Sequence, residues 1–193
     1  GRARILGIGR GGSSGAVFGA IGRGATSIDL GNRGCGDWTV ANTDGDLSIA
    51  NAGSGMIRAG TSRALELSVA GSGGVAAGAT GEADISIAGS GDIRLAATQA
   101  TEISVAGSGD VAIDRIQGDS LDVSIAGSGD VRVNGGEVRT VSVSIAGSGD
   151  VVFNGRAQDV SASIMGSGDV RIAEATGSVN RSIMGSGDIR IGE

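Results

Sequence analysis

Hydrophobic and polar residues alternate along most of the chain. Between residues 83 and 95, for example, the apolar positions are Ala83, Ile85, Ile87, Ile93 and Leu95, with polar or small residues between them. A period of two is typical of an extended strand with one buried face, whereas a helix needs apolar residues three and four positions apart. The pattern therefore predicts an all-β chain.

A short motif, Gly-Ser-Gly, separates the alternating segments. Its copies begin at Gly53, Gly71, Gly89, Gly107, Gly127, Gly147, Gly166 and Gly185, at steps of 18, 18, 18, 20, 20, 19 and 19 residues. Gly34-Cys35-Gly36, 19 residues before the first, reads as a ninth copy. A unit this short cannot bury its apolar face alone, but it can do so by stacking on a copy of itself.

We therefore expect a single-stranded parallel β-helix, or solenoid, of about nine coils of 18–20 residues. We expect it to be right-handed, because parallel crossovers overwhelmingly are. Equivalent inward residues should form ladders spaced by about 4.8 Å. The two predicted ladders are Leu67, Ile85, Ile103, Val123 and Val143, and Val69, Ile87, Val105, Ile125, Ile145, Ile164 and Ile183.

Both glycines of each Gly-Ser-Gly fall on the inward side of the alternation. We interpret them as corner residues, because the chain must bend toward its own interior there and a side chain would have no room. The predicted structural corner glycines are Gly89, Gly91, Gly107, Gly109, Gly127, Gly129, Gly147, Gly149, Gly166, Gly168, Gly185 and Gly187.

The two ends of the chain depart from the repeat. Residues 1–26 are Gly-rich and read as a degenerate first coil or a cap, and residues 27–193 form the repeat domain. Asn32 and Asn51 replace inward Val or Ile, and Arg181 takes an inward position in the last copy. Nothing after Ile191 resembles a cap. Open solenoid ends recruit further strands, so we expect a homo-oligomer that associates through them.

The amino-acid composition limits the reactions and partners that we expect for this chain. The 193 residues include no His, which removes the usual general base and a common metal ligand, so we expect no catalytic residue and no cofactor. A net charge of -6 and only three aromatic residues make nucleic acid an improbable partner. Cys35 is the single cysteine, so no internal disulfide can form. No apolar stretch is long enough to span a membrane, and no signal peptide is visible.

An aspartate follows most of the Gly-Ser-Gly copies. These residues should form an outward row in which each carboxylate accepts hydrogen bonds from nearby backbone amides. Arg94, Arg132, Arg171 and Arg190 each lie two residues after such an aspartate, which predicts a mixed Asp/Arg ladder. The alternative is a calcium row, although the adjacent Gly and Asp lack the spacer of calcium-binding nonapeptides. Its ligands would be Asp92, Asp110, Asp130, Asp150, Asp169 and Asp188.

Serines occupy a second outward row. They are Ser68, Ser86, Ser104, Ser124, Ser144, Ser163 and Ser182. Small hydroxyl side chains suit a tightly packed ladder, and a flat hydroxyl array is also a candidate surface for a glycan. A polysaccharide-cleaving enzyme would need long loops around a groove, for which coils of 18–20 residues leave no material.

The repeated Ile/Val-Ser-Ile/Val-Ala-Gly-Ser-Gly-Asp pattern, as in Val123 to Val133 and Val143 to Phe153, resembles the bacterial family of auto-transporter adhesin head GIN domains. The resemblance covers about residues 27–191. It implies a right-handed parallel β-helix at the bacterial cell envelope or secreted, and it transfers no functional residue. We therefore expect a non-enzymatic structural or adhesive module. The alternatives are a bactofilin-like cytoskeletal filament and a glycan-binding or glycan-active β-helix.

Overall fold

The computed structural model describes residues 2–7 and 26–192, and these residues contain strands and turns but no helix. The strands in chain order are β1 (Arg2–Gly7), β2 (Ser27–Asn32), β3 (Trp38–Val40), β4 (Asp46–Asn51), β5 (Ile57–Ala59), β6 (Ser62–Val69), β7 (Val75–Gly89), β8 (Ile93–Gly107), β9 (Val111–Gly127), β10 (Val131–Val133), β11 (Gly136–Gly147), β12 (Val151–Gly166), β13 (Val170–Ala175), β14 (Val179–Gly185) and β15 (Ile189–Ile191).

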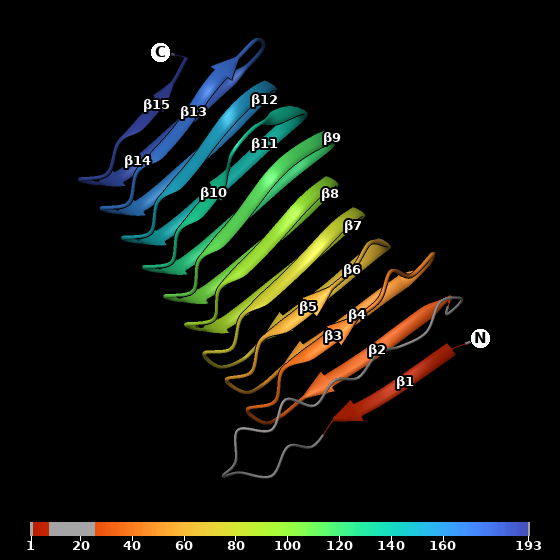
Figure 1. Cartoon of the computed structure of the whole chain (residues 1–193). Coiled ribbons are helices and arrows are strands. Elements are labelled where there is room, and N and C mark those ends of the chain that lie inside the picture. Colours follow the sequence, from red (N-terminus) through yellow and green to blue (C-terminus); the bar gives the residue numbers. More distant parts are fainter. Residues whose placement is uncertain (1, 8–25, 193) are drawn as a thin grey trace.

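The strands stack as coils along one axis, from β1 at one end to β15 at the other (Figure 1). One column of strands, here the first column, holds β1, β2, β4, β6, β11, β14 and the later parts of β7, β8, β9 and β12. The second column holds β3, β5, β10, β13, β15 and the early parts of the same four long strands. Every pairing is parallel, which confirms the predicted β-solenoid of about nine turns. Its right-handed sense stays a prediction.

Both predicted ladders are in register. Ile85 pairs with Ile103, Ile103 with Val123, and Val123 with Val143, so equivalent residues of successive coils lie above one another. The side chains of Ile85 and Ile103 are at most 1% exposed. Each such side chain contributes roughly 1.5–3 kcal/mol through burial, so the stacked ladders supply the core without aromatic residues.

The coils differ in length, and the extra residues enter at one place. Each coil has a corner turn at Gly-Ser-Gly and a return turn that leads from the second column back to the first. At the return turns within β8 and β9, Thr98 pairs with Ile116, whereas Ala100 pairs with Ser120. Two residues are therefore added to the longer coil at this turn. Both columns keep their register because the irregularity stays outside them.

At the N-terminal end, polar residues enter the core. Asn32 and Asn51 are each 1% exposed and pair in register, directly below Val69 of the second ladder. The residues 1–26 expected to form a degenerate first coil or a cap lie mostly outside the described ranges. Within them, β1 pairs in parallel with β2 over its whole length.

The C-terminal end leaves its last coil uncovered. Among the described residues, β14 pairs only with β12, and β15 only with β13. Ile183 continues the second ladder, yet it is 43% exposed, whereas Ile164 one coil earlier is fully buried. Arg181 pairs with the buried Ala162 and so takes an inward position, as the alternation of inward and outward residues along the sequence predicts.

Candidate functional site

The corner turns bring the backbones of successive coils into close contact. The first glycine of each corner from Gly71 onward has a φ between 140° and 159°, which L side chains rarely adopt. The second glycine faces the core: a Cβ on Gly109 would lie 2.8 Å from Ile87 Cγ2 and overlap the carbonyl oxygen of Gly91. The same overlap with the preceding coil recurs at the other corner glycines named above.

Each corner is also hydrogen-bonded to the coil before it. The backbone N–H of Ser108 donates to the carbonyl of Gly89 at 2.9 Å, and Ser128 donates to Gly107 at the same distance. Glycine is therefore needed at these positions because a side chain would hold adjacent coils apart and break these bonds.

The corner aspartates form a hydrogen-bonded column. Oδ1 of Asp110 accepts the backbone N–H of Asp130 at 3.0 Å, and Asp130 does the same for Asp150 at 2.9 Å. The chain of bonds continues from Asp150 to Asp169 and from Asp169 to Asp188. Each carboxylate therefore satisfies an amide of the next coil, and the column joins the coils along their corner edge.

The column is interrupted where the repeat departs from its pattern. Asp37 accepts the N–H of Met56 at 2.8 Å, but Met56 and Gly74 carry no carboxylate for the coils that follow them. The Sδ and Cε atoms of Met56 instead lie 3.0 Å from the place where a Cβ of Gly74 would be. Asp92, directly after the gap, has no hydrogen-bond partner for its side chain within the described residues.

The predicted Asp/Arg ladder is wrong for all but the last coil. Arg190 pairs with Asp188 at 3.0 Å, whereas Arg94, Arg132 and Arg171 form no ion pair among the described residues. The carboxylates of Asp130 and Asp169, which precede Arg132 and Arg171, already accept the amide of the following coil. Within the described part of the chain, Asp92 accepts no such bond, and nothing in the structure explains why Arg94 does not pair with it. Asp188 belongs to the last coil and lacks that amide, so its carboxylate is available to Arg190.

The residues that the structure describes contain no group of side chains arranged like a metal site. No three side chains of His, Cys, Asp or Glu come together there as a metal ion would need. The six aspartates weighed as a calcium row lie one per coil, and four of them accept an amide proton. The hypothesis of a calcium row thus gains no support from the site geometry.

The serine row lies on the outer face of the first column. Ser68, Ser86, Ser104, Ser124, Ser144, Ser163 and Ser182 pair in register from coil to coil. Most of them are exposed, and their neighbours in the direction of the corner are small alanines up to Ala146. Met165 and Met184 replace that alanine in the last two coils and are 58% and 68% exposed.

A column of carboxylates beside the serines was missed by the sequence reasoning. Glu66, Asp84, Glu102 and Asp122 pair in register on four successive coils, next to a hollow of about 390 Å³. Like charges this close repel by about 1 kcal/mol per pair in water, so the strip is strongly negative. The signal was present, because each acidic residue stands two positions before a serine of the row.

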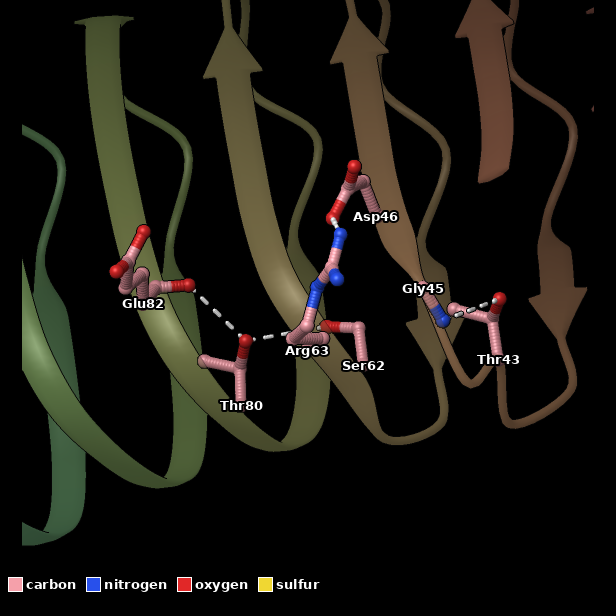
Figure 2. Close-up of polar contacts among 7 residues, drawn as sticks. All are labelled: Thr43, Gly45, Asp46, Ser62, Arg63, Thr80 and Glu82. Carbon is pink, nitrogen blue, oxygen red and sulfur yellow. Dashed lines mark hydrogen bonds and ion pairs between the residues drawn. The ribbon is translucent and has the colours of Figure 1, made fainter. Parts of the chain in front are cut away.

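Polar contacts also link the return turns. Figure 2 shows the guanidinium of Arg63 beside Asp46 and the hydroxyl of Thr80 between Ser62 and the carbonyl of Glu82. The Nη2 atom of Arg63 lies 2.8 Å from Oδ1 of Asp46. The hydrogen bond with Asp46, followed by its negative charge, raises the pKa of Arg63. Further along the solenoid, a return-turn column of Gln117, Glu137, Arg156 and Glu174 runs in register across four coils.

Comparison with known families adds an independent observation. The sequence matches the family described as "Putative auto-transporter adhesin, head GIN domain" over residues 11–115 and again over residues 96–192. The chain belongs to this family. The two matches to the GIN domain overlap, as expected of a pattern that repeats in every coil. No curated protein and no solved structure matches the chain.

The family description names an adhesin head, which fits a module that acts through its surface. In this GIN domain the surface includes the serine row, the acidic column, the aspartate column and the return-turn column. Within the described residues, no helix has the length and apolar character needed to cross a bilayer.

Proposed function

We propose that this GIN domain is a non-enzymatic structural and adhesive module at the bacterial cell envelope or exterior. The single observation that carries the proposal is the serine row, which repeats a small hydroxyl side chain in register on seven successive coils of one sheet face. A flat, regular array of this kind offers the same hydrogen-bonding group at intervals of about 4.8 Å along the solenoid. The adhesin description of the family supports the same function.

Stiffness supports the structural part of the proposal. The coils are joined by backbone bonds in both columns, by the buried ladders and by the aspartate column. In such a quasi-one-dimensional stack, each coil is stabilised mainly by its two neighbours. The domain would therefore hold its outer face flat while that face contacts another surface.

Retention on a cell surface tests the proposal. We would measure binding of the purified domain to immobilised bacterial envelopes and to extracellular polysaccharide by biolayer interferometry. The test variant carries Ser86→Gln, Ser104→Gln and Ser124→Gln, which replace the flat row by long side chains on three successive coils. The matched control carries Ala76→Gln, Ala112→Gln and Val152→Gln on the outer face of the second column.

The proposal predicts that the serine variant loses retention and that the control keeps it. Equal retention of the two variants, or the absence of any retention by the wild-type domain, would contradict it. Circular dichroism on both variants establishes that the fold is intact.

Association through the C-terminal end belongs to the same proposal. Val179 and Ile183 are 38% and 43% exposed in the last coil, and edge strands of this kind recruit further strands. Arg181 opposes dense stacking, since a second coil placed on β14 would bury its charge without a partner. We therefore expect association to be weak and concentration-dependent.

The exposed last coil is also the observation that favours the alternative, a bactofilin-like filament. A filament former would assemble through its ends without any ligand. Negative-stain electron microscopy of the purified domain separates the two functions, because continuous filaments at low concentration would favour the alternative.

A further inference from the structure

Two adjoining hollows lie along the return turns between β9 and β13. The first has a volume of about 420 Å³ and is lined by side chains of successive coils, among them Arg115, Gln117, Glu137, Asn154 and Arg156. The second has a volume of about 300 Å³ and shares Glu137 and Arg156 with the first. These two side chains therefore form a wall between two neighbouring polar compartments.

Two glycines form part of the wall of the first hollow. Gly136 and Gly155 line it, and a Cβ on Gly155 would lie 2.8 Å from Cε2 of Phe153. A Cβ on Gly136 would overlap the carbonyl of Ile116 in the coil below. Any larger residue would displace the packed return turn, so the wall of the hollow is backbone at these two positions.

Among the described residues, some polar side chains around the first hollow have a hydrogen-bond or ion-pair partner, and others have none. Arg156 is held by Glu174, with Nε 3.1 Å from Oε2, and this pair is in register across two coils. In the part of the chain that the structure describes, Arg115, Gln117, Glu137 and Asn154 have no hydrogen-bond or ion-pair partner for their side chains. The hollow thus combines one fixed guanidinium with a second free guanidinium, two free amides and one free carboxylate.

We propose that these hollows bind an acidic oligosaccharide, with the carboxylate of one sugar on Arg115 and its hydroxyls on Asn154 and Glu137. The inference goes beyond the proposed adhesive function, because the hollows at the return turns are a second site, separate from the serine row. A guanidinium pairs with a carboxylate through two parallel hydrogen bonds, and this geometry is specific as well as strong. A carboxamide can both donate to and accept from a sugar hydroxyl, while the carboxylate of Glu137 accepts from one.

The mixture of charges selects this class over simpler ligands. An inorganic anion such as sulfate would pair with Arg115, but it has no hydroxyl group to donate to the carboxylate of Glu137. A neutral sugar offers Arg115 only uncharged hydroxyl oxygens, which accept weaker hydrogen bonds than a carboxylate does. A sugar acid satisfies both, because its carboxylate and its hydroxyls lie on one ring.

The second hollow argues for more than one sugar unit. It contains the pair Arg139 and Asp119, whose Nη2 and Oδ1 atoms are 3.5 Å apart, together with Gln158 and Thr176. These side chains offer donors and acceptors directly beyond the wall of Glu137 and Arg156. A linear oligosaccharide can therefore place consecutive units in the two hollows.

A titration with tetragalacturonate, a linear chain of four uronic acids, tests the inference. We would record backbone and side-chain amide shifts of the isotope-labelled domain by NMR. Cellotetraose, a neutral chain of the same length, is the ligand control. The test variant is Arg115→Ala, and the matched control is Arg94→Ala, which removes an exposed, unpaired arginine away from both hollows.

The expected result is a set of shifts confined to the return turns around residues 115–119, 135–139, 154–158 and 173–176. Arg115→Ala should weaken binding by about tenfold, which corresponds to about 1.4 kcal/mol, while Arg94→Ala changes nothing. Arg115→Lys should give an intermediate affinity because it keeps the charge and loses the planar fork.

Three outcomes would overturn the inference: no shifts at the return turns, equal binding of cellotetraose, or equal weakening by both alanine variants. These outcomes leave the adhesive function open to its own test. If envelope retention depends on the serine row while tetragalacturonate does not bind, the proposed function stands and the acidic-oligosaccharide site is wrong. If tetragalacturonate binds as expected without any retention on envelopes, the site stands and the adhesive function is wrong.

Discussion

Asn32 donates its side-chain amide to Oδ1 of Asn51 at 3.0 Å, across two coils and inside the core. Asn51 in turn donates to the carbonyl of Gly55 at 2.9 Å, and the backbone N–H of Gly34 donates to Asn32 at 3.2 Å. Both side chains are 1% exposed, so their polar atoms depend on these partners. The two asparagines therefore fix the first corners by hydrogen bonds where later coils use Val and Ile.

Asn51→Ala should destabilise the domain by about 2 kcal/mol. The substitution leaves the amide of Asn32 without its strongest acceptor and the carbonyl of Gly55 without its donor. Urea unfolding followed by circular dichroism measures the loss. The double variant Asn32→Val with Asn51→Val also leaves the backbone N–H of Gly34 without its acceptor, so it should be no more stable than Asn51→Ala. A double variant close to the wild type in stability would contradict this reasoning.

Asp130→Ala should cost about 1 kcal/mol, since the amide of Asp150 loses its acceptor. Asp130→Asn should cost less, because an amide oxygen can still accept that bond. Asp92→Ala is the matched control: it occupies the same position of the repeat, and its side chain has no hydrogen-bond partner among the described residues. Equal losses in Asp92→Ala and Asp130→Ala would show that the column of bonds contributes nothing.

Gly109→Ala should destabilise the fold by about 3 kcal/mol through overpacking. The added methyl group would lie 2.8 Å from Ile87 Cγ2 and overlap the backbone of Gly91. Gly135→Ala is the control, because the nearest atom to its added methyl group is the carbonyl oxygen of Asn154 at 3.9 Å. Thermal unfolding of the two variants should separate them clearly, and similar midpoints would refute the role assigned to the corner.

Asp159 gives the domain a pH-dependent contribution. Its Oδ1 accepts the backbone N–H of Ser178 at 2.9 Å, and this bond lowers the pKa of Asp159 below the ordinary value of 3.8. A carboxyl group whose pKa falls on folding stabilises the native state above its unfolded pKa, and the contribution disappears as the pH falls through the folded pKa. The wild type should therefore lose stability below about pH 4 relative to Asp159→Asn.

Urea midpoints at neutral and acidic pH measure this difference. The other carboxyl groups titrate in both proteins and cancel from the comparison. A constant difference between the wild type and Asp159→Asn over this range would contradict the assignment.

Arg181→Val should increase self-association. The variant removes the charge from an inward position of the open last coil and extends the apolar surface of Val179 and Ile183. Sedimentation velocity over a range of concentrations measures the shift. Arg171→Val serves as the control, because it removes the same charge from an exposed outward position one coil earlier. If both variants sediment like the wild type, the C-terminal edge is not the association surface.

The features that repeat in every coil could be predicted from the sequence. The ladder from Val69 to Ile183, the inward asparagines and the corner glycines follow from a period of two and a period near 19 residues. Every coil must bury alternate residues and bring its backbone close to the next coil. The same residue types therefore recur in each copy of the repeat. The serine and aspartate rows were visible for the same reason.

The relationships between coils of unequal length could not be predicted. Thr98 pairs with Ile116 whereas Ala100 pairs with Ser120, and only the folded return turn decides where the two added residues go. The hollows beside Arg115 and Arg156 depend on that placement. The failure of the Asp/Arg ladder at Arg132 has a similar cause, because the amide of Asp150 reaches the carboxylate of Asp130 only when the coils are stacked.

The sequence by itself determined that identical coils stack with alternate side chains inward, because a strand buries one face only if its apolar residues recur at every second position. The tertiary structure decided which polar side chains of different coils meet. That choice depends on the register between coils, which is not encoded within a single repeat.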